Sequence, residues 1–396
     1  MKRFVLCLLL AAALAGVSFS QVIFNQAVGK RSNAAGHFDK NGSLHVVIQG
    51  DSLGRGGINE KRWRYLSVSN ASVKIDEQFD APAEATIAGV FAATPDTIHL
   101  LIANTNAAEG YSPIHFLRTH GRWTRGGPVP VEVEALSPLH SATAIVSDGS
   151  LYYFYLDLRE TERSTIHCSA WQPPQGWSKL PPVNSGEEVR FLACVGDFQS
   201  QRPALGWTTK SGRCYYISEF DPGKNPQRVQ NIPTTTNTTL VLHKTDSDYC
   251  VLAISDLLKT NWERQQTTIN LYQTVGARQI ESGFVLTNHF PSKLEHPYFS
   301  RNAEDITLVW SSPADGQAPY EAPRDMFYST QRAENWSEPR RLNFKSADHL
   351  GIKMLDGSCQ GGRLRIGVLL HPSGFMSSVS HNSRIEIIEI DEKVGK

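Results

Sequence analysis

The sequence predicts an all-β fold, a β-propeller of seven four-stranded blades, from a tryptophan-marked repeat, recurring strand–turn–strand units, and the lack of a long amphipathic helical pattern. Trp123 and Trp177 lie 54 residues apart, and Trp336 follows 159 residues later, which is three steps of 53. Residues 21–396 hold seven such steps. A fixed repeat of this length with several short strands is typical of propeller blades. Six blades are the alternative, and a pair of β-sandwiches fits less well because sandwiches lack this period.

Each of these tryptophans follows the same local pattern, in which a short strand and a turn precede Trp-Ser or Trp-Thr and a second strand. The three copies lie in residues 114–124, 166–183 and 326–342. The pattern therefore marks the end of each blade.

Strand–turn–strand units fill the space between these markers. Asn41-Gly42 and Asp148-Gly149 are hairpin signals between runs rich in Val, Ile, Leu, Phe and Tyr. The expected strand pairs are residues 35–39 with 44–48, 143–146 with 151–155, and 298–300 with 306–310. Residues 22–24 form a short apolar segment that we expect to pair with the last blade and close the ring.

The N-terminus has the features of a secretory signal peptide. Lys2 and Arg3 precede an apolar run over residues 4–17, and Ser18-Phe19-Ser20 offers a cleavage site before Gln21. The run is short for a membrane span. We therefore expect a signal peptide at 1–20, a single propeller domain at 21–396, and a secreted protein, extracellular or periplasmic. An uncleaved N-terminal anchor is the alternative.

Composition limits the classes of partner. The chain has 39 basic and 39 acidic residues, so no overall field attracts nucleic acid or an anionic membrane. Five cysteines follow the signal peptide, an odd number that does not suggest a disulfide framework, and none has metal-ligand spacing. We expect no cofactor and no metal. The five are Cys168, Cys194, Cys214, Cys250 and Cys359.

Residues 335–342 and 176–181 resemble the blade ends of sialidase-like propellers, which often carry an Asp-box, S-x-D-x-G-x-T-W. Ser329 and Trp336 have the spacing of this box, but Gln331, Ala333 and Asn335 occupy its Asp, Gly and Thr positions. The resemblance implies the propeller architecture. The arginine triad that sialidases use to hold a carboxylate has no match, so catalytic residues cannot be assigned from the family.

Loop lengths indicate which face of the propeller carries function. The turns between first and second strands are short, whereas the loops between second and third strands are often long. The long ones are expected at residues 51–60, 104–112, 311–324 and 371–383. Long loops on a rigid scaffold commonly carry binding residues, so the long-loop face is the predicted functional face.

Polar and aromatic residues near the expected channel mouth supply the candidate ligand-binding set. Histidines and carboxylates at the starts of inner strands could polarise a sugar or carboxylate ligand, although capping of strand backbones is the simpler interpretation. Tryptophans at second-strand ends could stack on sugars, although packing between blades is commoner. The candidates are His140, His296, His349, Glu84, Glu188, Glu295, Asp348, Trp207 and Trp310.

These features favour a binding module that holds a carbohydrate or protein ligand on the long-loop face. A glycoside hydrolase at the channel mouth is the first alternative, because Glu84, Glu188, Glu295 and Asp348 could supply the carboxylate pair that such enzymes use. A protein-interaction scaffold is the second alternative.

Overall fold

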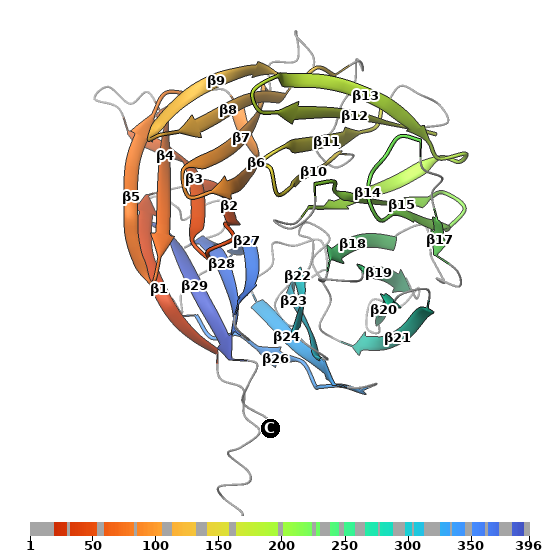
Figure 1. The fold of residues 1–396 in the computed structure, drawn as a ribbon. Helices are drawn as coiled ribbons and strands as arrows, with labels where there is room; N and C mark the ends of the chain where they lie inside the picture. Colours follow the sequence, from red (N-terminus) through yellow and green to blue (C-terminus); the bar gives the residue numbers. More distant parts are fainter. Residues whose placement is uncertain are drawn as a thin grey trace, which may run out of the picture.

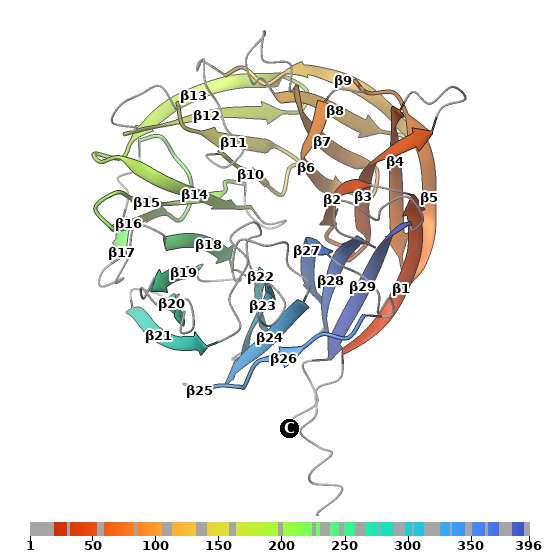
Figure 2. The same ribbon diagram turned by 180° about the vertical axis from the view of Figure 1, so that it is seen from behind.

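Seven sheets arranged in a ring make up the described part of the chain, and no α-helix occurs in it (Figure 1). The computed structural model describes residues 20–29, 32–53, 59–82, 85–104, 113–131, 141–157, 164–196, 201–223, 227–229, 238–244, 249–257, 266–275, 278–287, 298–302, 305–312, 325–332, 335–344, 351–360, 363–371 and 382–391. Figure 2 shows from behind that each blade runs from an inner strand near the axis to an outer strand at the rim. The predicted all-β propeller with seven blades is confirmed.

The first four blades follow the chain in order, and each pairs its four strands consecutively. Blade 1 contains β2 (Asn33–Phe38), β3 (Leu44–Leu53), β4 (Asn59–Ser69) and β5 (Ser72–Phe79). Blade 2 contains β6 (Ala85–Thr94), β7 (Thr97–Asn104), β8 (Pro113–Thr119) and β9 (Arg122–Pro128). Blade 3 contains β10 (Ser141–Ile145), β11 (Leu151–Tyr155), β12 (Thr165–Gln172) and β13 (Gly176–Asn184). Blade 4 contains β14 (Val189–Val195), β15 (Ala204–Thr209), β16 (Cys214–Ile217) and β17 (Gln227–Val229).

The remaining blades complete the ring. Blade 5 contains β18 (Thr238–Lys244), β19 (Tyr249–Leu257), β20 (Gln266–Val275) and β21 (Arg278–Thr287). Blade 6 contains β22 (Tyr298–Asn302), β23 (Asp305–Ser312), β24 (Asp325–Arg332), and an interrupted outer strand made of β25 (Asn335–Trp336) and β26 (Arg340–Arg341). Blade 7 contains β27 (Gly351–Gln360), β28 (Arg363–His371), β29 (Ser383–Asp391) and β1 (Ser20–Gly29).

Blade 7 joins the two ends of the described chain. Its inner three strands come from the C-terminal part, and β1 pairs antiparallel with β29, with Val22 opposite Ile388 and Phe24 opposite Ile387. The prediction that residues 22–24 close the ring is therefore confirmed. Phe24 then packs into the cluster of buried apolar side chains between blades 7 and 1.

Apolar side chains on both faces of each sheet pack against the neighbouring blades. One cluster of buried side chains joins Phe38 and Leu44 of blade 1 to Leu369 of blade 7, and another joins Phe154 of blade 3 to Trp207 of blade 4. Further clusters join blades 1 and 2, 2 and 3, 4 and 5, and 6 and 7. The core is thus a series of layers between blades.

The predicted turns are present where the sequence placed them. In the β2–β3 turn, Gly42 adopts a φ of 73°, a left-handed conformation that glycine adopts without strain, and Asp39 Oδ1 accepts the N–H groups of Asn41 and Ser43. Gly149, with a φ of 82°, plays the same part between β10 and β11.

The predicted loop asymmetry holds in blade 2, where residues 95–96 join the first two strands and residues 105–112 join the next two. The prediction is wrong for blade 4. There the loop between the first two strands, residues 196–203, is longer than the loop between the second and third strands, residues 210–213. In blade 1 the loop expected at 51–60 is shorter than expected, since β3 continues to Leu53 and β4 begins at Asn59.

The tryptophan markers lie at or near the start of outer strands, with Trp123 in β9, Trp177 in β13 and Trp336 in β25. The partial Asp-box spans the β24–β25 hairpin, where Ser329 Oγ donates a hydrogen bond to the Ser337 carbonyl over 2.6 Å. The repeat therefore reports the third-to-fourth strand hairpin of each marked blade.

Inner strands pair on one side only, so their second edge carries backbone groups that need other partners. The Asp39 N–H donates to the carbonyl of Ser43, the residue just before β3, so the N–H of neighbouring Phe38 points away from β3. Asp356 of blade 7 accepts that N–H over 2.6 Å. In the same way, His37 Nδ1 of blade 1 accepts the Ala92 N–H of blade 2 over 3.3 Å. Side chains thus link successive inner edges.

Ring closure can be tested at Phe24, whose side chain is 8% exposed on β1. Replacing Phe24 with Ala should lower the free energy of unfolding by about 3 kcal/mol, because it leaves a cavity between blades 7 and 1. Urea unfolding measures the change. Gln21→Ala, at an exposed position of the same strand, is the matched control and should change the value by less than about 0.5 kcal/mol. Equal effects of the two substitutions would contradict a closing role for β1.

Candidate functional site

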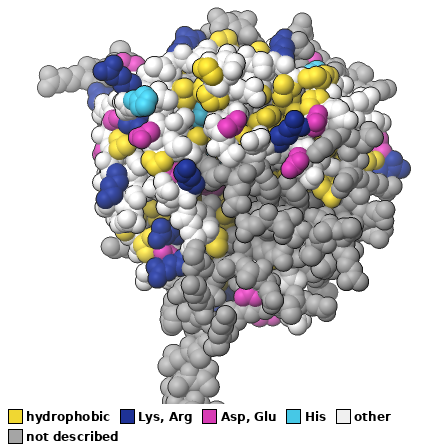
Figure 3. Space-filling view, viewed as in Figure 1, with side chains coloured by type: hydrophobic (Ala, Val, Ile, Leu, Met, Phe, Trp, Pro, Cys, Tyr) yellow, Lys and Arg dark blue, Asp and Glu magenta, His cyan; other side chains and the backbone are white. Residues whose placement is uncertain are grey.

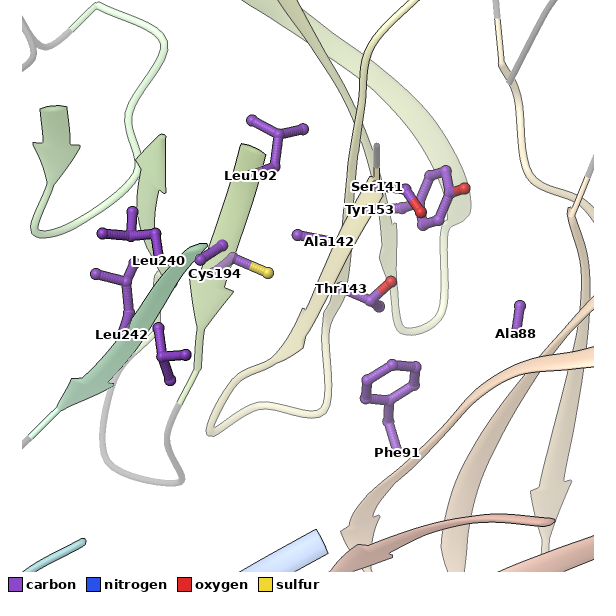
Figure 4. Close-up of a pocket in the computed structure, with 12 residues that line it drawn as sticks. Ala88, Phe91, Ser141, Ala142, Thr143, Tyr153, Leu192, Cys194, Leu240 and Leu242 are labelled. Atoms are coloured by element: carbon purple, nitrogen blue, oxygen red, sulfur yellow. The ribbon is translucent and has the colours of Figure 1, made fainter. Parts of the chain in front are cut away.

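A cavity of about 350 Å³ lies beside the axis of the ring, bordered by inner strands of four consecutive blades (Figure 4). We call it the axial cavity. Its lining residues are Ala88 and Phe91 of β6, Ser141, Ala142 and Thr143 of β10, Tyr153 of β11, Leu192, Ala193 and Cys194 of β14, and Leu240, Val241 and Leu242 of β18. Ser141 is the first residue of β10, and inner strands begin at the long-loop face, so the cavity extends toward that face.

The lining is apolar and contains a few hydroxyl groups. Leu192, Leu240 and Leu242 form one side, and Figure 4 shows the ring of Phe91 on the opposite side. Ser141, Thr143 and Tyr153 contribute the oxygen atoms. None of the described residues that line the cavity is charged. Such a lining suits a neutral ligand with both apolar and hydroxyl surfaces.

Cys194 is the one sulfur atom among the lining residues, and Figure 4 shows its side chain directed toward Ala142. Burial raises the pKa of the Cys194 thiol strongly, and it raises the pKa of Cys168 in the adjacent layer as well. Both thiols therefore stay protonated at neutral pH. A protonated thiol is a poor nucleophile, so Cys194 acts as a small apolar wall residue.

Most of the sequence-predicted channel-mouth residues lie outside the described residues, so their positions stay predictions. This group comprises His140, His296, His349, Glu84, Glu295 and Asp348. Glu188 is described, in the connection that leads into β14. Its carboxylate lies 2.8 Å from Lys210 Nζ and 3.4 Å from an Arg190 nitrogen. It therefore takes part in an ion-pair group on the long-loop face of blade 4, and it does not line the axial cavity.

Trp207 and Trp310 are fully buried, with 0% exposure. Trp207 stacks on Tyr215 with ring centroids 5.7 Å apart, and Trp310 stacks on Phe327 at 6.0 Å. Trp207 also belongs to the cluster between blades 3 and 4. In this conformation neither indole offers a face to a ligand. Trp207 fits the alternative interpretation of packing between blades, and Trp310 stacks within blade 6.

A buried chain of polar groups lies between blades 1 and 2. Asp39 Oδ2 is 3.1 Å from His45 Nε2, and His45 Nδ1 is 2.7 Å from the Tyr65 hydroxyl. Hydrogen bonds, foremost from His45, hold the pKa of Asp39 below its usual value against the opposing effect of burial. The order Asp–His–Tyr resembles a proton relay, but His45 and Tyr65 are 0% exposed. Its role is to satisfy buried polar groups.

The same chain continues toward the rim through Arg118, whose guanidinium lies 4.8 Å from the centre of the Tyr65 ring. Arg118 donates to Glu77 over 2.6 Å, and the Trp123 indole N–H donates to the same carboxylate over 3.0 Å. Glu77 is on blade 1, whereas Arg118 and Trp123 are on blade 2. One charged pair therefore fixes the lateral position of two adjacent blades.

The described surface shows no strong charge preference. Figure 3 shows basic and acidic side chains interspersed over the described part of one face. No helix in the described residues is long and apolar enough to cross a membrane. The same residues contain no group of three or more His, Cys, Asp or Glu side chains placed to hold a metal ion.

Sequence reasoning missed Phe91, Thr143 and Tyr153, which line the axial cavity. They lie in strands that the sequence marks only as apolar. Whether such a residue faces the axis depends on register, which hydrophobic content does not reveal.

No family model matches the sequence, and no curated protein matches it. Among solved structures, the polysaccharide lyase Uly1 is similar, with a TM-score of 0.54 and 11% identity over 91% of this chain and 89% of that chain. The phage phi92 endosialidase has a TM-score of 0.47 and 9% sequence identity, over 92% of this chain and 76% of that chain. A six-bladed fungal lectin from Aleuria aurantia has a TM-score of 0.41 and 13% sequence identity, over 67% of this chain and 80% of that chain. At these identities the similarity to Uly1 shows the fold alone.

The structural role of Trp207 predicts a stability effect. Trp207→Ala should lower the free energy of unfolding by about 3–5 kcal/mol, because it removes a fully buried indole between blades 3 and 4. Lys210→Ala, at the exposed end of the same strand pair, should cost less than about 1 kcal/mol, since exposed ion pairs contribute little. Denaturant titration of both variants checks this. A Trp207 variant as stable as the parent protein would contradict the packing role.

Proposed function

We propose that this protein is a carbohydrate-binding propeller that holds a neutral sugar unit in the axial cavity, entered from the long-loop face. The observation that supports the proposal best is the cavity lining, whose described residues combine apolar walls with three hydroxyl side chains and include no charged group. Its volume of about 350 Å³ falls within the range of small-molecule sites.

A sugar ring matches such a lining because it has apolar C–H faces and a hydroxyl-bearing edge. The ring of Phe91 offers a surface on which a C–H face can pack. The hydroxyls of Ser141 and Thr143 can each donate and accept hydrogen bonds. A ligand held in this way gains apolar burial and keeps its own hydroxyl groups satisfied.

Binding is favoured over hydrolysis by the carboxylates that the structure describes. Glycosidases commonly use two carboxyl groups on opposite sides of the bond that breaks. The described residues that line the axial cavity include no carboxyl group, and the carboxylate of Glu188 is engaged by Lys210 and Arg190. The described lining residues also include no cationic group that would hold a sialic acid carboxylate, so we favour a neutral sugar over a sialoside.

Secretion is part of the same proposal. The basic N-terminus, the apolar run over residues 4–17 and the small residues before Gln21 support a signal peptide. A secreted propeller would meet glycans of cell surfaces or of the extracellular matrix. N-terminal sequencing of the exported protein, with Gln21 expected as the first residue, tests this step.

The binding site can be tested by filling the axial cavity. Ala88 is exposed on β6 beside the cavity, so Ala88→Trp should block a ligand without replacing a core residue. A glycan array followed by calorimetry should show binding of neutral glycans by the parent protein and at least a tenfold loss for Ala88→Trp. Ser178→Trp, at an exposed position of β13, is the matched control and should bind normally. Equal binding by both variants would place the site elsewhere.

The enzyme alternative has a direct test. The purified protein should not hydrolyse a panel of fluorogenic glycosides that includes sialosides. Turnover that disappears in Glu295→Ala or Asp348→Ala would replace the binding proposal with a hydrolase at the channel mouth. Turnover that survives both substitutions would establish an enzyme with a different site.

A further inference from the structure

Two histidines form a buried pair inside blade 2. His99 of β7 and His115 of β8 are both 0% exposed, and their rings stack with centroids 5.2 Å apart and planes 7° from parallel. His99 Nδ1 lies 3.1 Å from His115 Nε2, which is a hydrogen bond. One ring must donate and the other accept, so the pair as it stands requires both imidazoles to be neutral or to share one added proton.

The pair contacts blade 3 through two tryptophans. Trp171 of β12 meets both rings edge-on, with centroids 4.8 Å from His99 and 5.5 Å from His115. Trp177 of β13 meets His115 edge-on at 5.5 Å. On the other side, a Cβ atom at Gly126 would lie 2.6 Å from His115 Nδ1, so a glycine is needed there. The imidazoles thus fill the seam between blades 2 and 3.

The outer nitrogens of the pair lack partners. Neither His99 Nε2 nor His115 Nδ1 has a hydrogen-bond partner among the described residues, and the same holds for the nearby Trp177 Nε1. Whichever ring donates the central bond, one of the two outer nitrogens is an orphan donor and the other an orphan acceptor. Unsatisfied buried polar atoms are costly and rare in native proteins. Exposure of the seam to water would provide partners for these atoms, so their desolvation favours opening.

An added proton would find little electrostatic support at this seam. None of the eight strands β6 to β13 contains an aspartate or a glutamate. The titratable side chains on strands β11 to β13 of blade 3 are Tyr152, Tyr153, Tyr155, His167, Cys168 and Lys179, of which Tyr152 and Cys168 pack toward blade 4. Burial lowers the pKa of His99 well below its usual value and lowers that of His115 to about 4.

The seam adjoins the axial cavity. Phe91, which lines the cavity on β6, is the direct cross-strand partner of His99 on β7. Tyr153, which lines it on β11, belongs to the apolar cluster that joins blades 2 and 3, and Trp171 and Trp177 pack against that cluster. The cavity is lined by residues of both β6 and β10, and farther from the axis the two blades meet in the layer that contains the histidine pair and the hydrogen bond from Ser169 Oγ to the Pro130 carbonyl.

We propose that the seam between blades 2 and 3 is an acid-sensitive opening point, where protonation of the His99–His115 pair separates the blades and loosens the adjoining axial cavity. Opening exposes both imidazoles to water, where each can be protonated and solvated. Release of a ligand on acidification is the consequence for binding, and this last step rests on the proposed function. The opening itself does not.

The sign of the pH effect follows from the directions above. Both histidines bind protons more weakly in the closed state than in the open one, so the closed state is fully stable above pH 6.5 and loses stability as the pH falls toward about 4. At pH 5 the opening equilibrium should rise roughly 30-fold for one histidine, and up to roughly 1000-fold if both are protonated on opening.

Hydrogen exchange with peptide-level mass spectrometry tests the opening without any ligand. After correction for intrinsic exchange, a fall from pH 7 to pH 5 should accelerate exchange at least tenfold in β7, β8, β12 and β13. His37 and His371, whose pKa values are also lowered by burial, lie in blades 1 and 7, so a local response identifies the seam. Acceleration spread evenly over the ring, or none, would overturn the proposal.

The double variant His99→Leu/His115→Leu removes the titrating groups. If it folds, its seam should exchange equally at both pH values, whereas a retained acid response would overturn the proposal. His120→Asn is the matched control, an exposed histidine in the β8–β9 turn with a φ of 49° that asparagine tolerates, and it should keep the acid response. If the double variant fails to fold, histidine NMR of the parent protein is the test instead. Titration of both rings with pKa values near 6.5, without opening of the seam, would overturn the proposal. Glycan affinity at pH 7 separately tests the proposed function.

Discussion

The pairing of β1 with β29 is the interaction on which the rest of this molecule depends. A four-stranded blade cannot bury both of its faces alone, so every blade needs a neighbour on each side. The chain provides six of the contacts between blades by running forward, and β1 completes the seventh, because it adds Phe24 and Val28 to the buried cluster between blades 7 and 1. With the ring closed, the inner strands surround a common axis, and the residues of the axial cavity come together from four blades.

Closure also leaves backbone polar groups at the inner strand edges without partners in the sheet, and side chains of neighbouring blades bond some of them. Each inner strand has one unpaired edge, and Asp356 and His37 cover two such edges by reaching across to the next blade. Burial raises the pKa of Asp356 and lowers that of His37, so it disfavours the charged form of both groups. The axial cavity continues this trend with an uncharged lining. The interior of the ring is therefore a low-charge environment, in contrast with the mixed charges of the surface (Figure 3).

The strands and their grouping could be predicted because local chemistry fixes them: Asn41-Gly42 and Asp148-Gly149 set turns, and the tryptophan period sets the blades. The cavity could not, because facing depends on register. A β-bulge between Ile87 and Gly89 changes which side chains of β6 face the axis just before Phe91. No residue type in the sequence predicts this bulge. The sequence predicts Trp207 and Trp310 at the ends of their strands. In the structure β15 and β23 continue to Thr209 and Ser312, which places both indoles in strand interiors.

The antiparallel register of the closing pair also determines how the ring responds to force. Ser20 lies opposite Ile390, so the beginning of β1 and the end of β29 leave the sheet at the same edge. Tension between them loads the hydrogen bonds one after another, as in peeling, whereas shear would load them together. The closing pair can therefore be peeled apart by force applied at these two strand ends, with Val22 and Phe24 among the first apolar contacts released.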